Sequence, residues 1–239
     1  MIAPARRRFA PEPPGTQPPY DWPDYTSTIK RHPKRELIAV PHTLSEITGP
    51  SFAEQWPGAP LVDLTRVREG APEAMGQRIT VEGRVLDEDG RPLRNTLIEF
   101  WQANAAGRYH HSEDQHDAPL DPNFTGVGHT YTDDEGRWRF MTIRPGAYPW
   151  RNTYNAWRAA HIHFSVFGAG FASRLITQMY FPGDPLMAWD PVYHSVADQA
   201  ARERMISTYV PDLSQAEYSM GYRWDIVMRG RDETPMENR

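Results

Sequence analysis

The sequence predicts an all-β fold, an antiparallel β-sandwich with little helix. The 239 residues include 23 prolines and 17 glycines, which divide the chain into many short segments. Several of these segments alternate apolar and polar residues, as strands do when one face is buried. Only one segment, residues 197–209, has a helical pattern. The length is sufficient for one sizeable core.

The first third of the chain differs from the rest. Residues 1–75 are rich in proline, which disfavours helix interiors and central strands. The first dozen residues are expected to be a disordered tail. Aromatic residues such as Tyr20 and Trp22 indicate that the remainder is an arm lying on a partner subunit or on the chain's own core. We therefore predict a division into an N-terminal arm and subunit-contact segment, 1–75, and a sandwich domain, 76–239.

The strands are predicted in order from their alternation and from the turns that separate them. Asp89-Gly90, Asp134-Glu135-Gly136 and Pro145-Gly146 are turn signals. The predicted strands cover residues 79–87, 96–104, 137–143, 160–167, 174–181 and 222–228. The predicted helix at 197–209 has Asp198 near its start, where an acidic cap is favourable.

Composition excludes several classes of function. A formal net charge of −5 argues against a nucleic-acid partner. No apolar run approaches the roughly 18 residues that span a bilayer, and the basic N-terminus lacks the apolar stretch of a secretory signal. There are no cysteines, so a metal would have to be held by His, Tyr, Asp or Glu. We expect a cytoplasmic protein that contacts neither membrane nor nucleic acid.

A candidate metal pair lies within one predicted strand. His161 and His163 are two residues apart, so both imidazoles share a face of the strand. On this pattern alone a solvated pair and a metal pair are equally plausible. A cupin would need a glutamate shortly afterwards, and none follows. Further histidines, His110, His111, His116 and His129, lie in a polar stretch and are expected to be solvated loop residues.

Two tyrosines stand in unusual contexts. Tyr109 ends the stretch WQANAAGRY, and Tyr148 lies in RPGAYPW. A single tyrosine in such a place is usually an amphipathic residue at the edge of a core. The combination with the histidine pair favours a shared site.

Longer stretches carry a resemblance to a known family. WQANAAGRYHH, APLDPNFTGVGHTYTDDEG, IRPGAYPWRN, WRAAHIHFSVFG and LITQMYFPGDP resemble the intradiol ring-cleavage dioxygenases, most closely the iron-bearing beta chain of the protocatechuate-cleaving branch. The resemblance covers nearly the whole chain, from about Tyr25 to Gly230. It implies a sandwich of the transthyretin (prealbumin) type and one Fe(III) per chain, bound by Tyr109, Tyr148, His161 and His163.

The chemistry of these ligands agrees with that implication. Fe(III) is a hard Lewis acid, and a phenolate is a hard anionic donor. A phenol ordinarily has a pKa near ~10, but a bound cation stabilises its deprotonated form. Two phenolates and one hydroxide would neutralise the charge of the ion, so that the centre could lie in a dry cavity.

The resemblance also implies roles around the metal. Tyr148 is expected to leave the iron when substrate binds and to act as a catalytic base, and Arg158 is expected to lie beside the substrate as a fixed cation. Gln178 matches a position behind the ligands. Tyr25, Trp150 and Val192 match positions that line the substrate pocket.

The implied reaction is the opening of protocatechuate (3,4-dihydroxybenzoate) by O2 to 3-carboxy-cis,cis-muconate. The expected partner is a homologous alpha chain that lacks the ligands and closes the pocket, in a hetero-oligomer of alpha–beta pairs. Two alternatives stay open: an intradiol enzyme acting on catechol or hydroxyquinol, and a non-enzymatic transthyretin-like binding module. The Pro-rich N-terminal region with Tyr25 favours the protocatechuate branch over the catechol branch.

Overall fold

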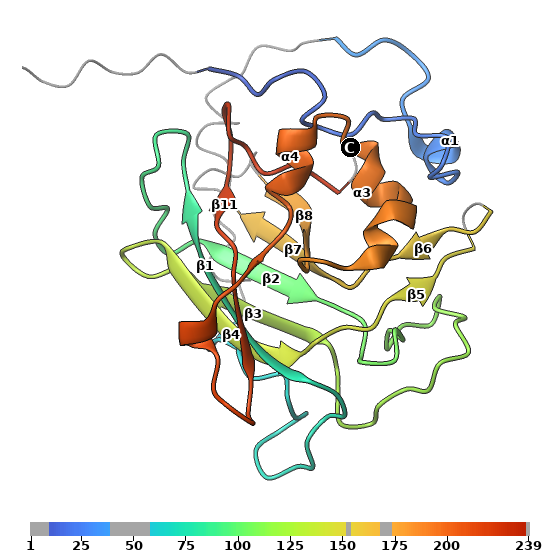
Figure 1. The fold of residues 1–239 in the computed structure, drawn as a ribbon. Helices are drawn as coiled ribbons and strands as arrows, with labels where there is room; N and C mark the ends of the chain where they lie inside the picture. The colour runs from blue at the N-terminus through green and yellow to red at the C-terminus, as the bar shows by residue number, and fades with distance from the viewer. Residues whose placement is uncertain (1–9, 39–57, 152–153, 168–173, 238–239) are drawn as a thin grey trace, which may run out of the picture.

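The computed structural model describes residues 10–38, 58–151, 154–167 and 174–237. Its regular secondary structure is mostly strand, in two stacked sheets, with short helices at one end (Figure 1). The predicted all-β sandwich is confirmed.

The first sheet is five-stranded and is built around the long strand β1. β4 pairs with β1 in antiparallel orientation and β9 with β10, whereas β10 and β11 both run parallel to β1. The sheet is therefore mixed at these two pairings. Its strands are β1 (Arg78–Leu86), β4 (Arg137–Ile143), β9 (Thr208–Tyr209), β10 (Met220–Arg223) and β11 (Ile226–Val227).

The second sheet is four-stranded and antiparallel throughout, in the order β3-β2-β7-β8. Its strands are β2 (Leu97–Trp101), β3 (Val127–Tyr131), β7 (His161–Phe167) and β8 (Arg174–Tyr180). A short ribbon of β5 (Tyr148–Pro149) and β6 (Trp157–Arg158) lies beside it. The helical segments are α1 (Thr28–Arg31), α3 (Pro191–Ser195), α4 (Gln199–Glu203), and the 3-10 turns η2 (Pro185–Trp189) and η3 (Pro211–Leu213).

The core lies between the two sheets. Phe100 of β2 stacks on Phe140 of β4 at 3.9 Å between ring centroids, and Phe164 of β7 packs against both. These rings are fully buried, and aromatic side chains of this kind supply much of the apolar area that a core removes from water. The inward face of β7 is thereby held rigidly, which fixes the direction of the histidines on its other face.

Several elements differ from the sequence prediction. β2 ends at Trp101, three residues before the end of the predicted strand 96–104. β3 was expected to be loop, because its inward positions are Gly128 and Thr130 rather than large apolar residues. A Cβ atom at Gly128 would meet the carbonyl oxygen of Leu61 at 2.6 Å, so the strand is packed too closely for a larger residue. His129 is thus a strand residue and not a loop residue.

The predicted strand 222–228 is divided, because β10 ends at Arg223 and β11 begins at Ile226. The predicted helix 197–209 is shortened to α4. Its cap is as expected, since the Asp198 carboxylate accepts from the N–H of Ala201, but Thr208 and Tyr209 pair with β10 instead of continuing the helix.

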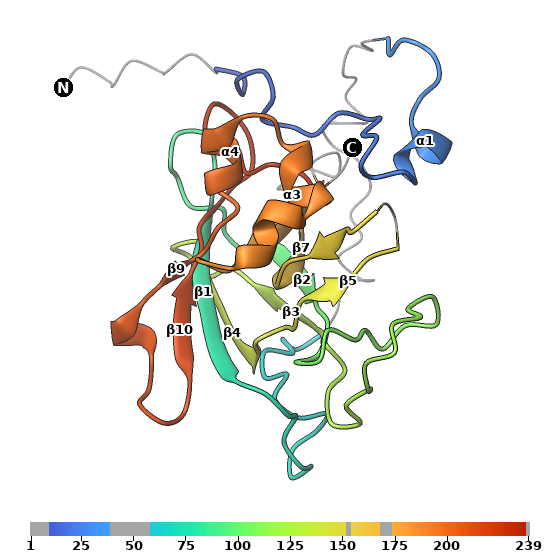
Figure 2. The same ribbon diagram turned by 45° about the vertical axis from the view of Figure 1, so that its right-hand side comes forward.

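The N-terminal arm is in contact with the domain. It runs along the end of the molecule that bears α3 and α4 (Figure 2), and the carbonyl of Gly15 accepts from the N–H of Asp198. Leu64 and Ala74 contribute to the main core. The division at residue 75 stays a prediction. Residues 1–9, where most of the predicted disordered tail lies, and residues 39–57 of the predicted arm lie outside the described residues.

Candidate metal centre

Strand β7 presents two imidazoles toward one point. The Nε2 atoms of His161 and His163 are 3.2 Å apart. The Nδ1 atom of each ring has its own acceptor: the carbonyl of Ala159 for His161 at 2.6 Å, and the carboxylate of Glu237 for His163 at 2.6 Å. Both rings therefore direct the Nε2 lone pair into the same space.

The two predicted tyrosines reach this space from other segments. The Tyr109 hydroxyl lies 3.4 Å from Nε2 of His161. The rings of Tyr109 and Tyr148 meet edge to face at 5.6 Å between centroids. The ring of Tyr148 is 5.8 Å from that of His161. All four predicted ligands thus form one cluster, drawn from β5, β7 and the loop after β2.

The loop that carries Tyr109 is shaped by its own polar residues. The Asn104 side chain accepts from the N–H groups of Ala106 and Arg108, and Gly107 adopts a φ of +79°. The Asp114 carboxylate then accepts from the N–H of Tyr109 at 2.7 Å. These bonds hold the phenol above β7.

Burial controls the charges in the metal-free cluster. Burial raises the pKa of Tyr109 well above its ordinary value, and it also raises the pKa of Tyr148. Burial lowers the pKa of His161 well below its ordinary value, and the nearby Arg158 cation acts in the same direction. The cluster therefore holds two phenols and, at His161, a neutral imidazole, until a cation supplies the charge that stabilises phenolate.

The donor set fits a hard metal ion. In the described part of the chain, no group of three or more His, Cys, Asp or Glu is arranged to hold a metal, so an ion at this place depends on tyrosine oxygens. Two nitrogens that share one metal ion at about 2.1 Å lie about 3 Å apart when they are neighbouring ligands. The Nε2 separation in this cluster agrees with that value.

Arg158 lies beside the cluster in a buried ion pair. Its Nε donates to both carboxylate oxygens of Asp190 at 3.1 Å, and its side chain is 5% exposed. Although burial alone would lower the pKa of Arg158, the Asp190 carboxylate holds it well above the ordinary value. The guanidinium also hydrogen-bonds the side-chain oxygen of Gln178. Arg158 is therefore a permanent cation with a fixed orientation.

Gln178 is buried and faces the cluster from the next strand, opposite His163 in the sheet register. Its oxygen accepts from the hydroxyl of Tyr180 at 2.8 Å, and its amide nitrogen donates to Glu237 at 2.8 Å. Gln178 thus lies beside His163, and its role behind the ligands stays a prediction.

The predicted pocket residues fall into two groups. Trp150 lies edge to face with Tyr25 at 4.7 Å, and the Arg158 guanidinium lies 5.3 Å from the Trp150 ring. Tyr25, Trp150 and Arg158 thus form a continuous row leading to the cluster. Val192 is buried in α3. Its N–H donates to Asp190, which pairs with Arg158 beside the cluster.

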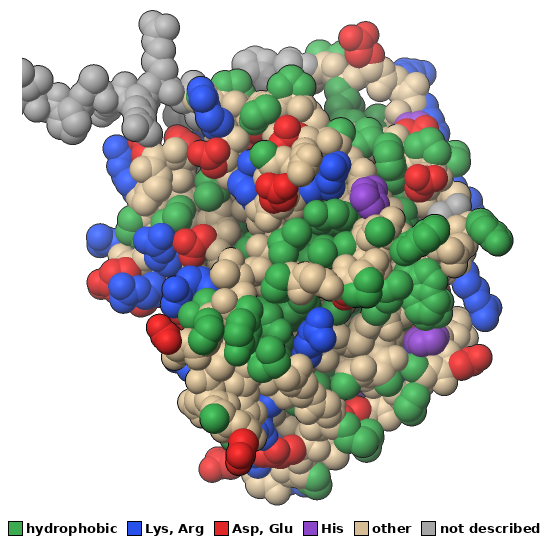
Figure 3. Space-filling model, viewed as in Figure 1, with side chains coloured by type: hydrophobic (Ala, Val, Ile, Leu, Met, Phe, Trp, Pro, Cys, Tyr) green, Lys and Arg blue, Asp and Glu red, His purple; other side chains and the backbone are tan. Residues whose placement is uncertain are grey.

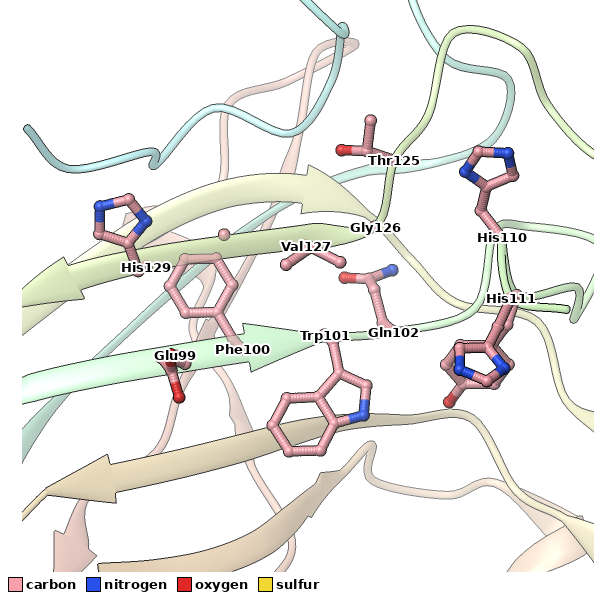
Figure 4. Close-up of a pocket in the computed structure, with 12 residues that line it drawn as sticks. Glu99, Phe100, Trp101, Gln102, His110, His111, Thr125, Gly126, Val127 and His129 are labelled. Carbon is pink, nitrogen blue, oxygen red and sulfur yellow. The ribbon is translucent and has the colours of Figure 1, made fainter. Parts of the chain in front are cut away.

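A cavity of about 340 Å³ opens on one side of the cluster. Figure 4 shows Trp101, His110, His111 and His129 around it. Tyr109 also lines it, but Tyr148, His161 and His163 do not. The ring of Trp101 stacks on that of His163 at 4.8 Å between ring centroids. His110 and His111 are exposed, as predicted for loop residues.

Sequence reasoning missed Asp190, Tyr180 and Glu237. Asp190 precedes a proline at a helix start, a pattern that predicts a cap but not an ion pair. Tyr180 is an ordinary strand residue in its sequence context. Glu237 is 74 residues from His163, and no spacing rule connects the two.

No helix among the described residues is long and apolar enough to cross a membrane. The cytoplasmic location stays a prediction.

Comparison with known proteins gives a consistent result. A family model described as Dioxygenase matches residues 47–230, and one described as Protocatechuate 3,4-dioxygenase beta subunit N terminal matches residues 9–43. The chain is 55% identical to the protocatechuate 3,4-dioxygenase beta chain of Burkholderia cepacia, over 93% of this chain and 94% of that one.

More distant relatives extend this result. The chain is 31% identical to the protocatechuate 3,4-dioxygenase alpha chain of Pseudomonas putida, over 82% of this chain and 95% of that one. The structure is also similar to that of 3-chlorocatechol 1,2-dioxygenase from Rhodococcus opacus 1CP, with a TM-score of 0.53 at 24% identity, over 76% of this chain and 70% of that one. The similarity to the chlorocatechol dioxygenase structure supports only the assignment of the fold.

Proposed function

The chain belongs to the intradiol ring-cleavage dioxygenase family, and from this premise we propose that it is an iron-bearing beta subunit that opens protocatechuate with O2 to 3-carboxy-cis,cis-muconate. One observation carries the proposal. Two half-buried tyrosine side chains and two imidazole nitrogens, drawn from separate segments, converge beside a fixed arginine.

We propose Fe(III) as the metal, one ion per chain, held by Tyr109, Tyr148, His161 and His163. Family members generally use non-haem iron, and the two phenol oxygens suit a hard trivalent cation better than a soft one. When bound, Fe(III) would supply Lewis-acid activation of the dihydroxybenzene ring toward O2.

Tyr148 is the proposed catalytic base. Its phenolate oxygen would take up a proton from a substrate hydroxyl. Its position supports this role, because β5 pairs it with Arg158 of β6 in the sheet register. The neighbouring cation favours the phenolate form, although burial opposes it.

Arg158 and the aromatic row have the proposed roles of positioning and charge stabilisation. The guanidinium cannot swing away, because Asp190 and Gln178 both hold it, so it stabilises negative charge on the ring without rearrangement. Trp150 and Tyr25 provide apolar walls that exclude water and orient the substrate ring. We propose that Val192, which α3 carries, lines the substrate pocket, and that Gln178 lies behind the ligands.

We propose that a homologous alpha chain is the partner. Figure 3 shows hydrophobic side chains on the face that bears α3, β5 and β6. Tyr154 and Trp189, in the segments beside these elements, are 97% and 57% exposed. Exposed aromatic side chains of this kind are typical of subunit interfaces.

Turnover measurements test the proposal. The chain is purified alone and with a co-expressed alpha chain, and O2 uptake is measured with protocatechuate and with catechol. We expect protocatechuate to be the better substrate and the alpha chain to raise the rate. Preference for catechol by the chain alone would favour the catechol or hydroxyquinol branch. Absence of turnover by an iron-loaded pair would favour the non-enzymatic binding module.

A further inference from the structure

The last described residues of the chain touch the predicted metal centre. Glu237 lies ten residues beyond the end of β11, yet one of its carboxylate oxygens accepts from Nδ1 of His163 at 2.6 Å and from the Gln178 amide at 2.8 Å. The side chains of His163 and Glu237 are both only 13% exposed.

The tail that carries Glu237 is fastened at several points. Terminal segments fray unless such bonds hold them. The Glu237 N–H donates to the carbonyl of Ile176 in β8, and the Thr234 N–H donates to that of Val227 in β11. Thr234 is almost fully buried, and Met236 packs against the main core. The tail therefore has one defined course over the sheet.

The N-terminal arm forms hydrogen bonds with the same tail. The Gln17 side chain donates to the Glu233 carboxylate at 2.9 Å and accepts from the N–H of Met236 at 2.8 Å. A single amide thus joins the two ends of the chain immediately before Glu237. The backbone that carries the Glu237 carboxylate is therefore held by the N-terminal arm as well as by β8.

The two imidazoles are fixed by different means. For His161 the Nδ1 acceptor is the backbone carbonyl of Ala159, which any residue at that position would supply. For His163 the acceptor is a side chain from a distant segment. An acceptor at Nδ1 keeps the proton there, presents Nε2 as the donor atom and increases its basicity.

We infer that Glu237 is a positioning residue of the metal centre, which fixes the tautomer and ring orientation of His163 and, through the same oxygen, the orientation of the Gln178 amide. This inference rests on the proposed function. With its nitrogen bonded to Glu237, Gln178 turns its oxygen toward Arg158 and Tyr180. One carboxylate therefore orders both a metal ligand and the arginine beside it.

Substitutions at Glu237 test the inference. Glu237→Ala removes the acceptor, whereas Glu237→Gln keeps an acceptor oxygen without the charge. Glu135→Gln, in an exposed turn, is the control. The full chain is loaded with Fe(III), and three properties are measured: loss of iron to a chelator, position of the visible absorption band, and Tm of the metal-free protein.

We expect Glu237→Ala to weaken iron binding about 10- to 100-fold and to shift the band. The Tm of the metal-free protein should fall slightly, because His163 and Gln178 lose a largely buried acceptor. Glu237→Gln should retain most of the affinity and still shift the band, and the control should match wild type. An alanine variant with wild-type iron retention and an unshifted band would overturn this inference alone. A wild-type chain that binds no iron would overturn the proposed function and this inference together.

Discussion

Tyr148 differs from the other three predicted ligands in its surroundings. It pairs with Arg158 across β5 and β6 in the sheet register. Tyr148→Phe should still bind iron through three ligands, with altered colour. We expect its turnover to fall about 10²- to 10⁴-fold, because the base is lost. Steady-state O2 uptake measures this, with the exposed Tyr154→Phe as control. Wild-type turnover in Tyr148→Phe would reject the assigned role.

Asp190 has two functions in one side chain. It caps α3 by accepting from the N–H groups of Val192 and Tyr193, and it neutralises the buried Arg158. Asp190→Asn keeps a capping oxygen but leaves the cation unpaired. We expect a loss of about 3–5 kcal/mol in the free energy of unfolding, measured by urea denaturation.

Asp198→Asn is the matched control for this change. Asp198 caps α4 in the same way, and asparagine is an equally good cap, so the control should lose no more than about 0.5 kcal/mol. Equal losses in the two variants would show that Asp190 acts only as a cap.

The four members of the cluster could be proposed from the sequence because each lies in a local pattern or in a motif. His161 and His163 share a strand face by spacing, and the two tyrosines lie in the quoted stretches. The partners of these residues could not be predicted. Asp190, Tyr180 and Glu237 reach the site through tertiary packing, which no local periodicity encodes.

At the scale of elements, the loop after β2 places Tyr109 against Tyr148. Gly107 has a φ of +79°, and a Cβ atom there would lie 2.5 Å from the carbonyl oxygen of Ala147 and 3.1 Å from Cβ of Tyr148. Gly107→Ala should therefore displace the two tyrosine segments relative to each other. We expect lower iron occupancy and a loss of about 2–4 kcal/mol in stability.

Gly90→Ala is the control that distinguishes the effect of this close contact from the effect of backbone strain at a positive φ. Gly90 has nearly the same φ, +76°, with nothing within 4 Å of the added Cβ. It should cost only about 1–2 kcal/mol and leave iron occupancy unchanged. Equal occupancy in the two variants, measured by metal analysis, would contradict the role given to the loop.

The same scale shows where sequence reasoning succeeds and fails for the fold. β1, β4, β7 and β8 have large apolar residues on one or both faces, and their predicted spans agree with the structure within one residue at each end. β3 has glycine and threonine on its inner face, so its burial was invisible to a hydrophobic pattern. The parallel pairing of β10 with β1 depends on how the chain returns from α4, and periodicity carries no information on this.

For the whole molecule, the metal is expected to join parts of the fold that the sequence keeps apart. Its four predicted ligands come from the second sheet, the β5–β6 ribbon and the loop after β2. Removing iron should therefore lower the Tm. Free metal at about 1,000 times its Kd stabilises by about 4 kcal/mol, or about 10 °C for a chain of this size.

Calorimetry with and without a chelator measures the effect of iron removal. The double variant Tyr109→Phe with Tyr148→Phe is the control, and its Tm should not respond to the chelator. If the chelator also leaves the wild-type Tm unchanged, the cluster holds no metal that stabilises the fold.

The central claim is that two phenol oxygens and two imidazole nitrogens hold one trivalent iron ion. The most direct test is a visible spectrum with iron analysis, recorded before and after protocatechuate is added without O2. We predict about one Fe(III) per chain, a red tyrosinate-to-iron absorption band, and a change in that band when substrate replaces Tyr148. A colourless, iron-free protein from iron-replete cells, or a band that substrate leaves unchanged, would contradict the account.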